Sequence, residues 1–241
     1  MGGSFPVMAR QASKTDEDAD VAITVRVYDY VEIPKWLLAQ TLRHLSFIMG
    51  HAGVRVVTVA CTSVEPSQAC GGSPDWSSVL LRIVPHAAAN TRHNQLAFST
   101  GPYITVDYSR VKEVANRAGV HVDRMLGCVA AHELGHVLLG SNSHSSSGIM
   151  VGSWTRRELK EINDMNIWFL PFQTKRMRAN IVHQRGQIGT AEARSVGSNE
   201  SVNSHWLLRS YNCGWRRKPD VHIEIRGCGC FLRYQQGLYP K

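Results

Sequence analysis

The residues from Val122 to Leu139 constrain this fold more than any other segment, because their apolar side chains recur at helical spacing over a long stretch. Gly140 follows directly and favours a helix end at that point. A helix with such a stripe buries one face in the core of a domain. The predicted stripe consists of Val122, Met125, Leu126, Val129, Ala130 and Val137.

Two histidines lie on this predicted helix. His132 and His136 are four residues apart, and an α-helix turns once in about 3.6 residues, so both imidazoles project from one face. Two nitrogens then come within reach of one ion, at about 2.0–2.1 Å each. His144 follows in a polar stretch after Gly140 and is the only histidine between His136 and His183. We therefore expect His132, His136 and His144 to bind one metal ion.

Glu133 follows the first predicted ligand and projects beside the ion rather than onto it. A carboxylate there can take a proton from a metal-bound water and later deliver it to a leaving amine. Zinc suits three protein ligands plus a water, whose pKa it lowers to roughly 7, although iron or copper could bind the same imidazoles. The alternative is a pair of partly exposed surface histidines beside a solvated Glu133.

These residues resemble the motif of the metzincin clan of zinc peptidases. The matrixin branch of that clan carries the pattern HExGHxLGxxHS, followed shortly by a methionine. This chain is most similar to a group of bacterial metzincin-like peptidases that carry HELGHLLLGSNSH and GIM. The resemblance covers roughly residues 21 to 182 and says nothing about 184 to 241. The matching residues are His132, Glu133, Gly135, His136, Gly140, His144, Ser145 and Met150.

The resemblance implies a zinc-dependent endopeptidase. In such an enzyme His132, His136 and His144 would bind Zn²⁺, and zinc-bound water would hydrolyse peptide bonds with Glu133 as general base. Met150 would lie in a tight turn beneath the metal. The fold would be α/β (α+β), with a twisted mixed sheet of about five strands packed on an N-terminal helix and an active-site helix, followed by C-terminal helices. Residues 95 to 99 would form an antiparallel edge strand that pairs with an extended peptide or protein substrate.

The spacing departs from the strict clan pattern. In that pattern a glycine comes three residues after the second histidine and the third histidine comes six after it, where this chain has Leu139 and Asn142. Asn142 could bind only through its amide oxygen, which is a poor zinc ligand, so His144 is the preferred third ligand. No tyrosine follows Met150 closely, so the tyrosine ligand of some clan members is absent.

The rest of the chain predicts strands and helices in alternation. We expect strands at 21–30, 54–62, 79–84, 95–100 and 103–108. We expect helices from Pro34 to about residue 50, from Thr155 to about Asn166, and from Pro171 to about Ile181. The strand–helix–strand start favours parallel pairing. Thr155 and Glu158 have the spacing of a capping box.

Composition divides the chain into three regions. Residues 1–20 are polar and predicted to be disordered, 21–183 form the metzincin-like catalytic domain, and 184–241 are a basic, cysteine-containing extension. The net charge is +8, and a solvated basic tail explains it better than nucleic-acid binding, because we find no RNA-binding motif. An alternative function is a catalytically inactive, zinc-stabilised binding module whose basic tail contacts an acidic partner. No apolar run approaches the roughly 18 residues of a membrane span.

The six cysteines do not have the spacing of a four-ligand zinc site. Cys61 and Cys70 could form a disulfide in an oxidising compartment, and we expect Cys128 to be a buried thiol. Residues 1 to 14 lack the apolar core of a signal peptide. The expected location is therefore cytoplasmic, or secreted or periplasmic if the N-terminus given is incomplete. We expect a monomer.

Overall fold

The structure, a computed structural model, describes residues 21–61, 70–87, 95–195 and 230–234. For 186–195 and 230–234 it describes the course of the backbone. The predicted disordered segment 1–20 and most of the extension that begins at residue 184 lie outside the described residues. Within the described part, one sheet and five helices surround a single hydrophobic core.

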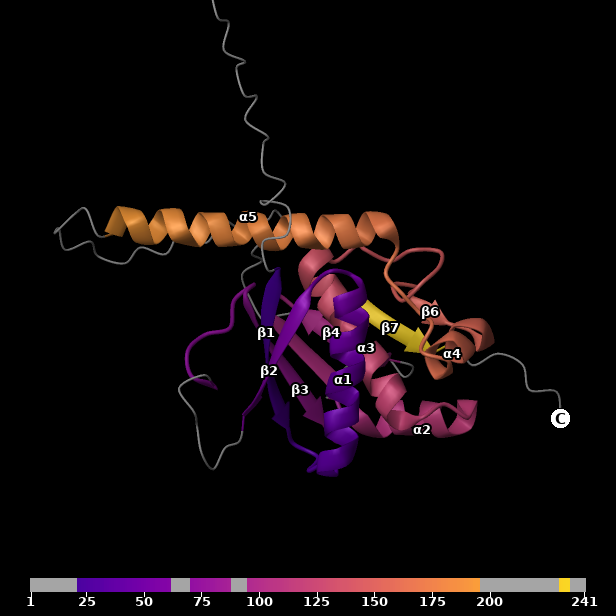
Figure 1. Cartoon of the computed structure of the whole chain (residues 1–241). Coiled ribbons are helices and arrows are strands. Elements are labelled where there is room, and N and C mark those ends of the chain that lie inside the picture. The colour runs from indigo at the N-terminus through magenta and orange to yellow at the C-terminus, as the bar shows by residue number, and fades with distance from the viewer. Residues whose placement is uncertain (1–20, 62–69, 88–94, 196–229, 235–241) are drawn as a thin grey trace, which may run out of the picture.

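The sheet contains seven strands in the order β2-β1-β3-β5-β4-β7-β6 (Figure 1). β1 is parallel to β2 and β3, and β3 is parallel to β5. β4 is antiparallel to β5 and to β7, and β7 is parallel to β6. The strands are β1 (Ala22–Asp29), β2 (Arg55–Cys61), β3 (Ser78–Val84), β4 (Gln95–Thr100), β5 (Tyr103–Asp107), β6 (Ser153–Trp154) and β7 (Cys230–Tyr234).

One expectation about this sheet is corrected by the structure. The five expected strands are present as β1 to β5, and β6 and β7 extend the sheet to seven strands beyond β4. The strand at residues 95–99 is antiparallel as expected, but it is not an edge, since β7 pairs with its outer side. The extension beyond residue 184 therefore contributes a strand to the sheet, a long-range pairing that no local sequence pattern could indicate.

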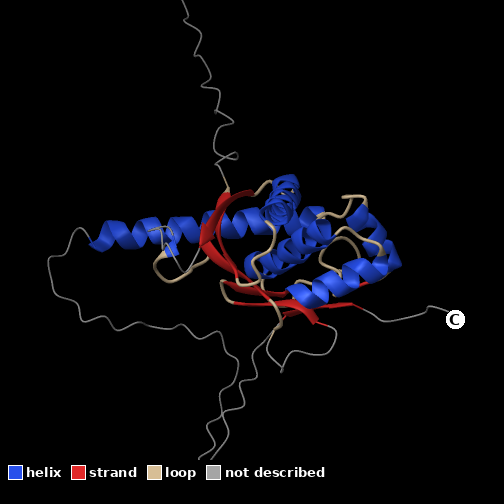
Figure 2. Ribbon diagram, turned by 90° about the horizontal axis from the view of Figure 1, so that it is seen from below, coloured by secondary structure: helices blue, strands red, loops and turns tan. Residues whose placement is uncertain are grey.

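The helices are α1 (Lys35–His51), α2 (Tyr108–Ala118), α3 (Val122–Leu139), α4 (Arg156–Asn163) and α5 (Pro171–Ser195). α1 and α3 pack together against one side of the sheet (Figure 2). They approach closely at Gly127, where an added Cβ would lie 2.6 Å from the Cβ atom of His44. Small residues at such a crossing bring the helix axes together and hold α3 firmly in the core.

Helix α2 was not predicted from the sequence, which suggested that a strand continues to Tyr108. The strand ends at Asp107, whose carboxylate accepts a hydrogen bond of 2.9 Å from the backbone N–H of Arg110 and so caps the new helix. Gly119 ends it in the left-handed conformation, with φ of 67°. An aspartate followed twelve residues later by glycine was the signal that could have revealed this helix.

The other elements lie close to their predicted ranges. The capping box of α4 is formed as expected, with Thr155 and Glu158 as its two members. α5 begins at Pro171 but continues to Ser195 rather than ending near Ile181. It crosses one end of the sheet and projects beyond it (Figure 1). Arg185 connects this helix to the first strand, because its guanidinium donates a hydrogen bond of 2.7 Å to the carbonyl oxygen of Ala22.

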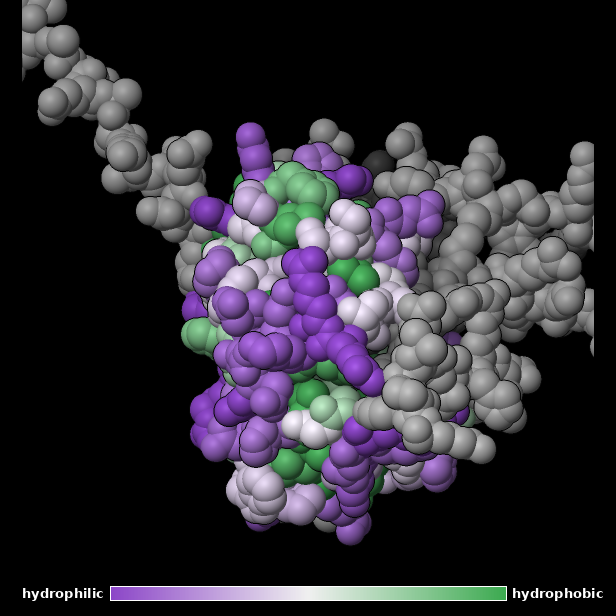
Figure 3. Space-filling view, turned by 90° about the vertical axis from the view of Figure 1, so that its right-hand side faces the viewer, coloured by the Kyte–Doolittle hydropathy of each residue, from purple (hydrophilic) through white to green (hydrophobic). Residues whose placement is uncertain are grey.

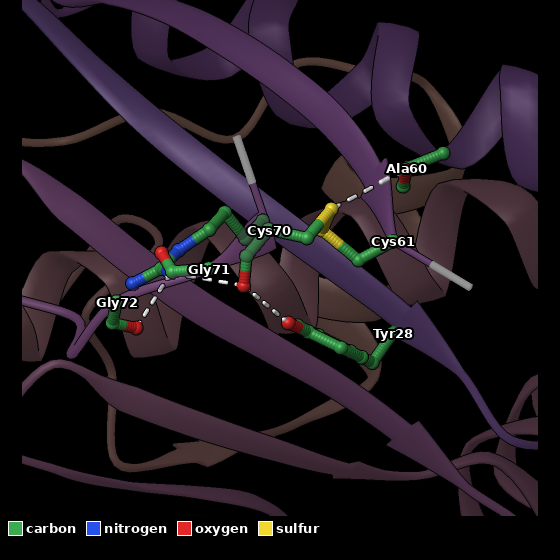
Figure 4. The surroundings of a disulfide bond; sticks show 7 residues. Tyr28, Ala60, Cys61, Cys70, Gly71 and Gly72 are labelled. Atoms are coloured by element: carbon green, nitrogen blue, oxygen red, sulfur yellow. Dashed lines mark hydrogen bonds between the residues drawn. A yellow bond between two sulfur atoms is a disulfide. The ribbon is translucent and has the colours of Figure 1, made fainter. Parts of the chain in front are cut away.

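Cys61 and Cys70, which the sequence left as a possible pair, form a disulfide that joins the end of β2 to the residues before β3 (Figure 4). The Tyr28 hydroxyl donates a hydrogen bond of 3.0 Å to the carbonyl oxygen of Cys70. The buried Arg26 guanidinium donates to the carbonyl oxygens of Gly71 and Gly72 at 2.8 and 3.0 Å. These bonds hold the loop over the face of the sheet opposite the helices.

Charged side chains cover the outer surfaces of α2 and α4. Hydrophilic residues dominate the face in Figure 3, with smaller hydrophobic patches between them. The ion pairs of these helices join neighbouring turns, such as Arg157 with Glu161 at 3.0 Å and Lys160 with Asp164 at 2.9 Å. In the part of the chain that the structure describes, no helix is both long enough and apolar enough to cross a membrane.

Candidate metal centre

Helix α3 positions two of the three predicted metal ligands. Every residue from Met125 to Leu139 is buried, so His132 and His136 project into the interior and not into solvent. Gly135, between them, allows a close approach of neighbouring segments. An added Cβ there would lie 2.6 Å from the Met150 sulfur and 2.7 Å from the Phe169 ring.

The chain leaves α3 abruptly at Gly140. Its φ of 97° lies in the region that favours glycine, and its N–H still donates a hydrogen bond of 2.9 Å to the carbonyl oxygen of His136. The Ser143 hydroxyl donates to the carbonyl oxygen of Gly140 at 2.7 Å. The Ser145 N–H donates to the carbonyl oxygen of Met150 at 2.9 Å. This compact loop returns the chain toward the helix that it has just left.

The loop brings His144 to the two helical histidines. The Nε2 atom of His136 lies 3.0 Å from the Nε2 atom of His132 and 3.0 Å from that of His144. Two nitrogens that bind one tetrahedral zinc at 2.0–2.1 Å lie about 3.3 Å apart. The observed separations therefore match three ligands that share one small cation. Asn142, the alternative third ligand, is exposed.

The hydrogen bonds on the far side of the two helical histidine rings define which of their nitrogens can bind a metal. The Nδ1–H of His132 donates to the carbonyl oxygen of Ile149 at 2.7 Å. The Nδ1–H of His136 donates to the Ser143 hydroxyl at 2.9 Å, because that hydroxyl uses its own proton for Gly140. Each Nε2 atom is then left with a lone pair. Two lone pairs at 3.0 Å repel each other. A cation placed between them would attract both and remove the repulsion.

Desolvation lowers the pKa of all three imidazoles and so favours their neutral forms. Desolvation lowers the pKa of His132 well below its usual value, and the neighbouring His136 lowers it further. Desolvation and the nearby His144 lower the pKa of His136 to about 4. The pKa of His144 is lowered by desolvation as well. Metal ligands must be neutral imidazoles, so protons compete little for this site at neutral pH.

Glu133 is fully buried beside the first ligand. Desolvation raises the pKa of its carboxyl group to about 8, and a hydrogen bond from the Ser99 side chain on β4 offsets part of that shift. Neither carboxylate oxygen has a partner with full hydrogen-bond geometry among the described residues. A buried carboxyl group with so little compensation is costly for stability and is typical of a functional site.

The loop with His144 is held in place by a residue of α5. The amide of the buried Gln173 donates hydrogen bonds to the Ser143 carbonyl oxygen at 3.3 Å and to the Ser145 hydroxyl at 3.2 Å. Its oxygen accepts a bond of 2.9 Å from the Leu170 N–H, so both ends of the amide are used. Gln173 therefore couples the start of α5 to the residues on both sides of His144.

Met150 and Trp154 form the apolar surroundings of the site. Met150 is fully buried, with its sulfur beside Gly135. The ring of Trp154 meets the His132 ring edge to face, with 5.9 Å between their centroids. Its indole N–H lies 3.4 Å from the Ile149 carbonyl oxygen that also accepts from His132. These side chains fix the orientation of the His132 ring.

The structure thus brings His132, His136 and His144 together, and it buries Glu133, the residue that follows His132. Their binding and catalytic roles stay predictions. Sequence reasoning did not single out Ser143, Gln173 or the carbonyl group of Ile149. No local pattern marks them, because a serine among other serines and a glutamine near a helix start occur in many proteins for other reasons.

The chain was compared with protein families, curated proteins and solved structures. No protein-family model matches the chain, and no curated protein matches it. Among solved structures, the crystal structure of archaemetzincin from Methanopyrus kandleri is similar, with a TM-score of 0.42 and 16% sequence identity. The similar region covers 68% of this chain and 97% of that one. A similarity of this size does not establish chemistry, and the geometry of the three histidines must carry the functional argument.

Proposed function

We propose that this chain is a zinc-dependent endopeptidase in which His132, His136 and His144 bind the ion and Glu133 is the general base. The observation that supports this most strongly is the convergence of three imidazole Nε2 atoms, separated by 3.0 Å along two sides. The fully buried Glu133 directly follows His132 in the sequence.

The donor set fits zinc. Neutral imidazoles are preferred zinc ligands, and three of them leave a fourth tetrahedral position for a solvent molecule. No fourth histidine, cysteine or carboxylate joins the group among the described residues. Zinc bound here would supply a Lewis acid and would lower the pKa of the solvent molecule at the fourth position to roughly 7.

Glu133 has the properties that proton transfer requires. Its pKa of about 8 places it near neutral pH, where a carboxyl group can both accept and release a proton. A cation nearby favours its ionised form, which accepts a proton from the attacking water. The same group then donates that proton to the amine that leaves when the peptide bond breaks. The buried position excludes competing bulk water from this transfer.

The test is the substitution Glu133→Ala in the zinc-loaded chain, with Glu113→Ala on the exposed surface of α2 as control. We expect turnover of casein or of a peptide library to fall by about 10²- to 10⁴-fold, the usual contribution of general acid–base catalysis. Zinc content should stay at one ion per chain, because Glu133 is not a ligand. Unchanged turnover in Glu133→Ala would contradict the proposal. A wild-type chain that holds zinc but cleaves none of these substrates would support the binding module.

A further inference from the structure

The strand β7 lies between β4 and β6 in the sheet. We propose that β7 is the chain's own ligand at the strand position between β4 and β6, and that any other peptide must displace it. The kind of molecule that would compete with β7, an extended polypeptide, follows from the proposed function, and in that respect the inference rests on it. Whether β7 occupies the position between β4 and β6 can be tested without measuring catalysis.

One side of this strand position is β4. β7 pairs with β4 in the antiparallel direction, with Cys230 opposite Ser99, Phe231 opposite Phe98 and Leu232 opposite Ala97. The other side of β4 is already paired with β5. Without β7, a row of backbone N–H and C=O groups on β4 would therefore be open, and such an edge binds extended peptides by adding a strand.

The opposite side of the position is β6. Arg233 and Tyr234 of β7 pair in the parallel direction with Ser153 and Trp154. β6 follows directly after the loop that carries His144 and Met150. A strand between β4 and β6 is thus held from both sides, while a single exposed edge would hold it from one side only.

The position also lies at the candidate metal centre. Ser99, the residue opposite Cys230, is the β4 residue whose side chain lowers the pKa of the buried Glu133. Trp154, the residue opposite Tyr234, packs against the His132 ring. β7 also contacts α3, the helix that carries two of the histidines. The backbone of β7 therefore pairs with Ser99 on one side and with Trp154 on the other. Ser99 lies near the predicted base, and Trp154 packs against a predicted ligand.

An occupant from the same chain has an advantage over a peptide in solution. It needs no bimolecular encounter, so it is present at a high effective concentration. A substrate peptide with similar backbone pairing would bind weakly until β7 is released or removed. The chain would then be less active in its intact form than after the C-terminal strand has left β4.

The test breaks the pairing of β7 within the full chain. In the double variant Phe231→Pro, Leu232→Pro, each proline lacks the N–H and disfavours a central strand. Adjacent strand residues direct their N–H groups to opposite sides, so one of the two prolines removes a donor that faces β4. The control is Gln236→Pro, Leu238→Pro, which places the same residues beyond Tyr234, where β7 ends.

Two measurements report occupancy without any catalysis. We expect the backbone amides of β4 to exchange with solvent deuterium at least tenfold faster in the Phe231→Pro, Leu232→Pro variant, with slow exchange retained in α3. A labelled peptide FLRYQQG, the sequence of residues 231–237, should bind that variant at least tenfold more tightly than it binds the wild-type and control chains. Unchanged β4 exchange or equal peptide binding would overturn the inference. Faster exchange in α3 as well would mean that the double variant disturbs the whole fold. The same measurements are then made on the milder single variant Leu232→Pro.

A peptidase assay on the same proteins separates this inference from the proposed function. We expect higher turnover of a casein substrate in the Phe231→Pro, Leu232→Pro variant than in the wild-type and control chains. If no chain is active but β4 exchange and peptide binding change as expected, β7 occupies the site and the endopeptidase proposal fails. If the wild-type and variant chains cleave equally and β4 exchange is unchanged, the occupancy inference fails and the endopeptidase proposal stands.

Discussion

The two halves of the metal centre are built in different ways. The helical half, His132 and His136, is buried, and its spacing follows from one turn of α3. The loop half, His144, is exposed and reaches the site through a turn at Gly140 and bonds from Gln173. A helix positions ligands by local geometry, whereas a loop positions a ligand only if distant residues hold the loop in place. Substitutions should therefore affect the two halves to different degrees.

The largest effect is expected from the helical half. His136→Ala removes the predicted ligand whose Nε2 atom lies 3.0 Å from both of the other Nε2 atoms. We expect zinc affinity to fall by at least about 1,000-fold, well beyond the 10- to 100-fold typical of residues that only support a ligand. Competition with a chelator of known affinity measures this. Retention of zinc at nearly wild-type affinity would mean that the helix does not carry the centre.

A smaller but still large effect is expected from the loop half. His144→Ala should weaken zinc binding by more than about 100-fold, because two imidazoles alone leave the ion without the third protein ligand that open zinc sites use. Asn142→Ala is the control, since Asn142 is exposed and is the alternative third ligand. The same chelator competition reports both variants. If Asn142→Ala weakened binding and His144→Ala did not, the assignment of the third ligand would be reversed.

The next largest effect is expected from the contact between α5 and the loop that carries His144. Gln173→Leu keeps the side chain's approximate volume but removes the bonds to Ser143, Ser145 and Leu170. We expect zinc affinity to fall by about 10- to 100-fold, and the free energy of unfolding to fall by about 1–3 kcal/mol because buried polar groups lose partners. Gln184→Leu on the same helix is the control. Unchanged affinity in Gln173→Leu would show that the loop keeps its position without α5.

The smallest effect concerns the space around the His144 ring. An added Cβ at Gly152 would lie 2.9 Å from Nδ1 of His144, so Gly152→Ala forces that ring to shift slightly. Because the ring is the end of a rotatable side chain, we expect a loss of zinc affinity of less than about tenfold. Gly50→Ala is the matched control, since nothing lies within 4 Å of its added Cβ. A loss as large as that of His144→Ala would mean that the loop half is as rigid as the helical half.

The same contrast explains what the sequence could predict. The range of α3 was predicted residue for residue, because apolar periodicity and Gly140 are local signals. The place of Gln173 beside Ser143 could not be predicted, since the two residues are far apart along the chain. The pairing of β7 with β4 is an extreme case, because any short strand can pair with any open edge. The missed helix α2 is different, since Asp107 was a local cap signal.

The central claim is that three imidazoles hold one divalent ion and leave a position for solvent. Zinc K-edge X-ray absorption of the zinc-loaded full chain tests it most directly. The expected spectrum contains three imidazole nitrogens at about 2.0–2.1 Å and one further oxygen that is not from the protein. It should lose one imidazole in His144→Ala. A sulfur ligand at about 2.3 Å, or four protein ligands around the ion, would contradict the claim.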